Sequence, residues 1–254
     1  MTTPLAAAPG QWAALSAVYT GQVSRAKAAR GPLLFVATLQ SVGILLLLRG
    51  VIDTGDATTG QQVVAGSTVL VVAFVALNLL AQRFGALRGE GGLDHYAALP
   101  VPASAVVLGT AASYATFTVP GAVLTAVTGC LLYGLPLVHL WVLVLVLPLA
   151  GASLAGLGAL LGLLAPRPEL ATVAGQLGMS AVLFLGIVPA DRMPFVLQVV
   201  RALLPSSYAA DALAGALGPR VDMAALLADL AVCAVVAVLS LASASAAYRR
   251  AVRQ

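Results

Sequence analysis

The feature that most constrains this chain is a run of 72 residues, from His95 to Pro166, that contains no Asp, Glu, Lys or Arg. In a soluble domain about one residue in four is charged, so a gap of this length is incompatible with an ordinary soluble core. Other uncharged stretches cover residues 31–48, 57–82, 170–190 and 230–248. Stretches of this length and polarity predict helices that cross a membrane.

The composition of the whole chain agrees with this prediction. Of the 254 residues, 61% are hydrophobic and 9% are charged, and the mean hydropathy is +1.02. The polar stretches between the apolar runs are too short to bury a core of their own. We therefore expect an all-α membrane protein in which residues 1–254 form a single transmembrane domain, with Cys130 and Cys233 as small packing residues inside it.

A helix that crosses about 30 Å of hydrocarbon needs roughly 20 residues, so the long uncharged run must supply two spans. The sequence predicts six spans, near residues 31–50, 63–82, 103–132, 137–164, 169–189 and 223–248. Ahead of them, the helical spacing of Trp12, Leu15, Tyr19 and Val23 predicts an amphipathic helix on the membrane surface over about residues 10–28.

The distribution of basic residues predicts the orientation of these spans. An even number of spans places both termini on one side of the membrane. With both termini in the cytoplasm, nine of the 13 Lys and Arg residues lie in cytoplasmic segments, as the positive-inside rule requires. We expect a multi-pass protein of the plasma (inner) membrane.

The motifs of several enzyme classes are missing from the sequence. It has no GxxxxGK[ST] loop, and its only lysine is Lys27, so it lacks the usual means of holding ATP phosphates. His95 and His139 have no Cys or carboxylate at metal-ligand spacing, and there is no GxSxG nucleophile motif. We expect no catalytic, cofactor or metal site on this chain, and no nucleic-acid partner.

Asp229 is the one acidic residue predicted to lie more than one turn inside a span. Ion-coupled transporters usually keep several ionisable groups at membrane depth, because these groups carry the coupling ion. A single carboxylate near the outer end of the last span is better suited to reaching the membrane interface or to pairing with an arginine from an outer loop. A secondary transporter that carries protons through Asp229 nevertheless stays open as an alternative.

Between the second and third predicted spans, the chain carries a segment that is longer than a minimal connection. Its periodicity predicts a short amphipathic helix over about residues 86–99 that docks in a groove on another protein. The apolar face consists of Leu93, Tyr96, Ala97 and Pro100. The charged residues expected to stay in water are Arg88, Glu90 and Asp94.

This segment, with the sequence GGLDHYAALPVPASAVVLG directly before a new span, resembles the cytoplasmic coupling helix of type-2 ATP-binding-cassette (ABC) permeases. In that family the coupling helix sits in a cleft of a separate ATPase subunit. The resemblance implies that the same segment contacts an ATPase here. The residues concerned are Arg88, Glu90, Leu93, Asp94, His95, Tyr96, Ala97, Leu99 and Pro100.

A second segment, FLGIVPADRMPFVLQVVRALLPSSYAADALAGAL, resembles the stretch that follows the fifth span in the same family. There it forms two short re-entrant helices, which implies a re-entrant segment over about residues 190–217. Physically, its apolar stretches are too short to span and too apolar for a free loop. The residues that carry the resemblance are Gly186, Pro189, Pro194, Pro205, Tyr208 and Asp211.

The resemblance implies the permease subunit of an ATP-driven exporter of drugs or lipids. Two copies, or one copy and a homologous permease, would pair with two ATPase subunits that hold ATP and Mg²⁺. A structural or sensory membrane protein without transport is a further alternative. Four polar residues within spans can face the pathway or form hydrogen bonds between helices, and the sequence leaves both roles open: Gln40, Ser41, Asn78 and Gln176. The apolar composition favours a small lipophilic substrate in contact with membrane lipid.

Overall fold

The computed structural model describes residues 10–25, 27–51, 57–93, 101–187 and 193–252. Every regular element within these ranges is a helix, which confirms the predicted all-α fold. In chain order the helices are α1 (Gln11–Arg25), α2 (Lys27–Val51), α3 (Ala57–Val72), the π-helix η1 (Ala73–Leu79), α4 (Leu80–Gly89), α6 (Ala103–Tyr133), the 3-10 helix η2 (Leu137–Val142), α7 (Leu143–Leu164), α8 (Pro168–Ile187), α9 (Phe195–Leu203), α10 (Pro205–Ala216) and α11 (Met223–Ala251).

Five described helices are long and apolar enough to cross a membrane, so the protein is a multi-pass membrane protein. They cover Thr58–Gly89, Ala103–Tyr133, Leu137–Leu164, Pro168–Ile187 and Met223–Ala251. α2 adds a shorter apolar stretch, Phe35–Gly50. Because α9 and α10 have only 9 and 12 residues, neither can span a bilayer.

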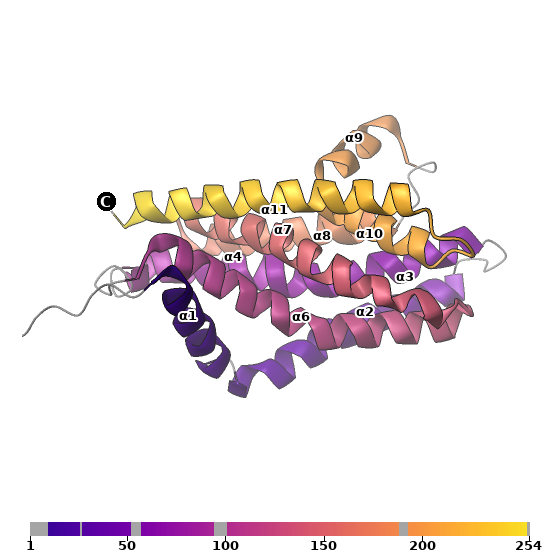
Figure 1. Ribbon diagram of the computed structural model, residues 1–254, viewed down its shortest axis with the longest axis horizontal. Helices are drawn as coiled ribbons and strands as arrows, with labels where there is room; N and C mark the ends of the chain where they lie inside the picture. Colours follow the sequence, from indigo (N-terminus) through magenta and orange to yellow (C-terminus); the bar gives the residue numbers. More distant parts are fainter. Residues whose placement is uncertain (1–9, 26, 52–56, 94–100, 188–192, 253–254) are drawn as a thin grey trace, which may run out of the picture.

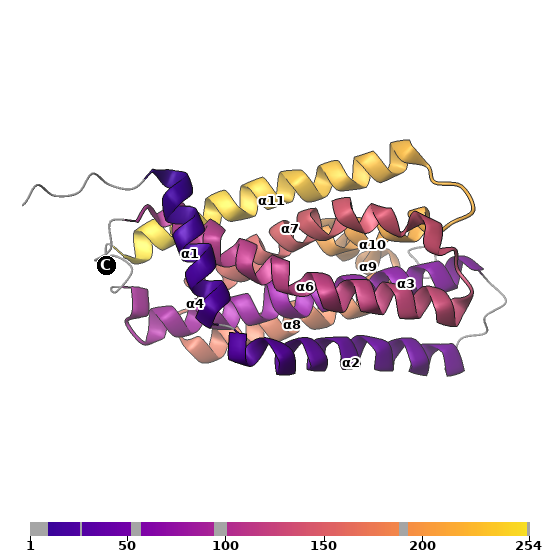
Figure 2. The same ribbon diagram turned by 60° about the horizontal axis from the view of Figure 1, so that its bottom comes forward.

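The long helices lie side by side and divide the molecule into two ends (Figures 1 and 2). One end carries α1, the end of α4, the turn between α7 and α8 and the last residues of α11. The opposite end carries the start of α3, the turn between α6 and η2, α10 and the start of α11. We refer to them as the α1 end and the α10 end.

The continuous helix formed by α3, η1 and α4 is the centre of the fold. It is the most deeply buried of the candidate spans, because α6, α7, α8 and α10 all pack against it. Its side chains form much of the hydrophobic core, including Val63, Leu70, Leu80 and Phe84. We refer to this helix, Thr58–Gly89, as the central helix.

Glycines allow α7 to approach the backbone of the central helix. A Cβ atom added to Gly158 would lie 2.4 Å from the carbonyl oxygen of Leu77, and one added to Gly162 would lie 2.4 Å from that of Ala81. Small residues commonly bring membrane helices this close, since apolar side chains gain little by leaving lipid for one another. The GxxxG spacing of these glycines thus serves packing within one chain.

At the α10 end, several residues cap helices or hydrogen-bond to the backbone groups at their ends. α6 ends at Gly134, whose φ of 68° is the left-handed conformation that glycine adopts most easily. Arg49 of α2 donates to the Leu132 carbonyl in the last turn of α6. The side chain of Asp222 accepts from the backbone N–H groups of Ala224 and Ala225, and thereby caps the start of α11.

We predict that Gly158→Ala lowers the free energy of unfolding by about 1–3 kcal/mol, because the added methyl group must push α7 away from the backbone of η1. Gly215→Ala is the matched control, since a Cβ atom at Gly215 in α10 meets nothing within 4 Å. Thermal unfolding in detergent measures both variants. Equal midpoints for Gly158→Ala and the control would contradict the packing argument.

Candidate functional site

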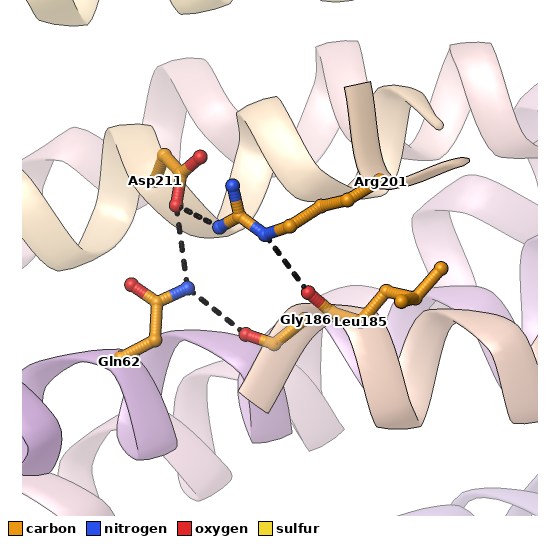
Figure 3. Close-up of polar contacts among 5 residues, drawn as sticks. All are labelled: Gln62, Leu185, Gly186, Arg201 and Asp211. Carbon is orange, nitrogen blue, oxygen red and sulfur yellow. Dashed lines mark hydrogen bonds and ion pairs between the residues drawn. The ribbon is translucent and has the colours of Figure 1, made fainter. Parts of the chain in front are cut away.

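A network of polar side chains joins four helices at the α10 end (Figure 3). Arg201 of α9 forms an ion pair with Asp211 of α10, and its Nε donates to the carbonyl oxygen of Leu185 in α8 at 3.0 Å. Gln62 of α3 donates from Nε2 to Asp211 at 3.3 Å and to the Gly186 carbonyl at 3.0 Å. We refer to Gln62, Arg201 and Asp211 as the outer network.

The outer network is the main polar attachment of α9 to the rest of the molecule. α9 has no buried residue, and Figure 1 shows it standing out from the bundle. The side chain of Arg201 is nonetheless only 11% exposed, while that of Asp211 is 35% exposed. A charge-assisted pair in this partly buried position stabilises the attachment more than a fully exposed pair would.

The sequence places prolines where α9 and α10 begin. Pro194 directly precedes α9, and Pro205 is the first residue of α10, where its missing N–H costs no helical hydrogen bond. The Tyr208 hydroxyl donates to the Ala202 carbonyl at 2.9 Å, which ties α10 back to α9. Of the other predicted outer residues, Gly186 lies in the last turn of α8 and contributes its carbonyl to the outer network. Pro189 lies outside the described residues.

Asp229 of α11 lies close enough to Arg201 and Asp211 to interact electrostatically with both. It is attracted to the guanidinium and repelled by the carboxylate. The described ion pair of Arg201 is with Asp211, and the repulsion of Asp229 by Asp211 outweighs its attraction to Arg201, so the pairing of Asp229 with an outer arginine stays a prediction.

A second polar cluster lies in the middle of the central helix. Asn78 is 2% exposed and belongs to the π-helix η1, a distortion that often marks functional positions. Its Nδ2 donates to Oε1 of Gln176 in α8 at 3.5 Å, and Gln82 donates to its Oδ1 at 3.0 Å. Gly175 makes room for the Asn78 side chain, because a Cβ atom there would lie 2.8 Å from Asn78 Oδ1.

The structure thus brings together two of the four predicted pathway residues, Asn78 and Gln176. Asn78 is enclosed within the chain, whereas Gln176 is exposed on the outside of α8. The other two, Gln40 and Ser41, lie on α2, which packs on α3 and α6. Ser41 is buried, and its hydroxyl has no hydrogen-bond partner among the described residues.

Arg88 departs from the expectation that it stays in water. Its Nη1 donates to the carbonyl oxygens of Leu163 at 2.5 Å and Ala165 at 3.2 Å, where α7 ends. The last carbonyls of a helix have no partner in the helix itself and carry partial negative charge, so a guanidinium satisfies them well. Arg88 is therefore a structural link between α4 and α7 as well as the start of the predicted coupling segment.

Leu93 also differs from the prediction that it forms part of a docking face. Its side chain is 4% exposed and belongs to the hydrophobic core, so it anchors the segment within the chain. Glu90 is exposed, as expected. The remaining residues of the predicted coupling segment lie outside the described residues: Asp94, His95, Tyr96, Ala97, Leu99 and Pro100.

Sequence reasoning missed Gln62, Gln82 and Arg201 as parts of polar clusters. Each stands near an apolar run, where a polar group must find a partner or a route to water. That signal marks such residues but does not identify their partners, since the partners of Gln62 and Arg201 come from other helices. Among the described residues, no group of three His, Cys, Asp or Glu side chains is placed to hold a metal ion.

In a comparison with known protein families, the family described as ABC-2 type transporter matches residues 16–217. This range includes the central helix, the predicted coupling segment and both α9 and α10. No curated protein matches the chain.

We predict that Arg201→Ala lowers the free energy of unfolding by about 1–3 kcal/mol, because it leaves the Asp211 carboxylate unpaired beside Asp229. Gln198→Ala is the control on the same helix, as the Gln198 side chain donates only to the nearby Met193 carbonyl among described groups. Thermal unfolding of these two variants, of Asp211→Ala and of the Arg201→Ala/Asp211→Ala double variant measures the effect. If the effects of Arg201→Ala and Asp211→Ala simply add in the double variant, Arg201 and Asp211 are not coupled.

Proposed function

The chain belongs to the ABC-2 type transporter family, which makes it a permease subunit, and we propose that it forms the pathway of an ATP-driven exporter. Two copies, or one copy and a homologous permease, would associate with two separate ATPase subunits in the plasma (inner) membrane. ATP and Mg²⁺ would bind to those subunits, and no covalent step would take place on this chain.

The observation that carries this proposal is the extent of the family match. It covers residues 16–217. The match therefore includes both segments to which the proposal gives a function: residues 86–99, which would contact the ATPase, and the stretch with α9 and α10, which would close the pathway on the outside. A match to a few apolar helices alone would carry much less weight, since apolar helices are common to unrelated membrane proteins.

The contacts of Arg88 suggest how force from an ATPase would enter the bundle. A push on residues 86–99 would reach α4 directly, because the segment continues from the central helix. It would also reach α7 through the two hydrogen bonds from Arg88 to the α7 carbonyls. Two spans would then move together, which suits an alternating-access mechanism driven by closure of an ATPase dimer.

The opposite end of the central helix carries Gln62, which contacts α8 and α10. From Gln62 to Arg88 the helix covers about 40 Å, at 1.5 Å per residue. We propose that this rigid helix transmits movement from the coupling segment to α9 and α10, and that these short helices close the pathway on the outside.

The pathway itself is proposed to run along the exposed side of α8, where Gln176 is linked to Asn78. An amide exposed at membrane depth is costly in lipid, but not beside a substrate or a second permease copy. The predominantly apolar surroundings favour small lipophilic compounds or lipids as substrates. Copurification of the tagged chain with its ATPase, followed by a screen for compounds that stimulate ATP hydrolysis, tests this proposal and identifies the substrate.

We predict that Tyr96→Asp strongly weakens binding of the ATPase, because it buries an unpaired charge in the docking cleft at a cost of several kcal/mol. Glu90→Ala is the control, since Glu90 is exposed at the start of the same segment and a rim charge contributes roughly 1 kcal/mol or less. Pull-down of the ATPase measures both, with folding checked by size-exclusion chromatography. Equal ATPase retention by Tyr96→Asp and the unmodified chain would contradict the coupling function of this segment.

We also predict that Asp229→Asn leaves transport largely intact, because an ATP-driven permease needs no carboxylate that carries protons. The measurement is efflux of the most stimulating compound from the screen, in proteoliposomes with the ATPase. Loss of efflux with normal expression and normal ATPase binding would favour the alternative, a proton-coupled secondary transporter.

A further inference from the structure

A cavity of about 400 Å³ lies at the α1 end, between the end of α4, the last turns of α7 and the last turns of α11. Its size falls within the range of ligand-binding pockets. It is distinct from both polar clusters described above, because none of their residues lines it. Its described lining residues are Arg88 and Arg250, the polar Ser243 of α11, and a set of alanines and leucines from α7 and α11.

The charge of the cavity is entirely positive, since no Asp or Glu is among its described lining residues. Arg250 is exposed, and Arg88 is half-buried. The described hydrogen bonds of Arg88 to the α7 carbonyls both use Nη1. A guanidinium carries five N–H donors, so Arg88 retains donors on Nη2 and Nε that those bonds do not occupy. Two such groups suit a phosphate, which guanidinium binds in a two-pronged geometry.

Apart from Ser243 of α11, the remaining described wall of the cavity is apolar. Leu160, Leu163 and Leu164 line it from α7, while Ala246, Ala247 and Ala251 line it from α11. Leu164 is 62% exposed, and because both helices are candidate spans, we expect this side of the cavity to face the hydrocarbon. A free phosphate ion would gain nothing from such a wall, whereas the acyl chain of a lipid would pack against it.

We infer that this cavity binds an anionic phospholipid, with the lipid phosphate between Arg88 and Arg250 and an acyl chain along the leucines and alanines. Cytoplasmic leaflets are rich in anionic lipids, and basic pockets between membrane helices are suited to their head groups. The proposed orientation places this end of the bundle in that leaflet. Arg88 also links α4 to α7. A bound lipid would therefore stabilise the contact between these two helices, at the start of the predicted coupling segment. The inference does not depend on the proposed export function.

Native mass spectrometry of the full chain in a neutral detergent, titrated with palmitoyl-oleoyl phosphatidylglycerol or phosphatidylcholine, tests the inference. We expect phosphatidylglycerol to bind more tightly, and Arg250→Gln to weaken its binding by about five- to tenfold, the effect of losing one charge-assisted contact. Arg249→Gln is the matched control, because it removes the same charge from the adjacent exposed position of α11, which does not line the cavity.

A third variant, Ala246→Leu, keeps every charge but fills part of the cavity, and we expect it to weaken phosphatidylglycerol binding as well. Size-exclusion chromatography checks folding. If Ala246→Leu does not fold, the comparison of Arg249→Gln with Arg250→Gln still tests the inference. Three results would overturn the inference: equal binding of both lipids, an equal effect of Arg249→Gln and Arg250→Gln, or displacement of the lipid by excess inorganic phosphate. The last result would assign the site to a free anion.

Discussion

The rest of the structure depends on the close approach of neighbouring helices to the backbone of the central helix. In a membrane the hydrophobic effect does not drive helices together, so close packing must stabilise the bundle. Gly158 and Gly162 of α7 lie almost against carbonyl oxygens of this helix, and Gly175 of α8 leaves room for Asn78. Because α7 and α8 are fixed to the same buried helix, a displacement of its end must be shared by both.

The two ends of the central helix make different kinds of contact. Gln62 joins it to α8 and α10 at one end, and Arg88 joins it to the end of α7 at the other. Both side chains bind backbone carbonyls, which are fixed in place by the helices that carry them. A helix anchored in this way at both ends is suited to transmit movement along its length, and the proposed mechanism relies on this property.

Much of the fold class follows from the sequence, because the absence of charge over 72 residues leaves few structures other than membrane helices. The family was also identified from the sequence, through two segments with specific patterns of glycine, proline and aromatic residues. The partners of Arg88, Gln62 and Arg201 could not be predicted, since each contacts a helix far away along the chain. Periodicity places a residue on a face, but it does not identify the helix opposite, and it therefore placed Arg88 in water and Leu93 on the docking face.

The central claim is that this chain moves a substrate only when a separate ATPase drives it. The most direct test is substrate flux in proteoliposomes, with the chain alone and with its ATPase, using either ATP or a pH gradient as the only energy source. The account predicts flux only when ATPase and ATP are both present, and none with an ATPase that binds but cannot hydrolyse ATP. Flux by the chain alone in response to a pH gradient would contradict it.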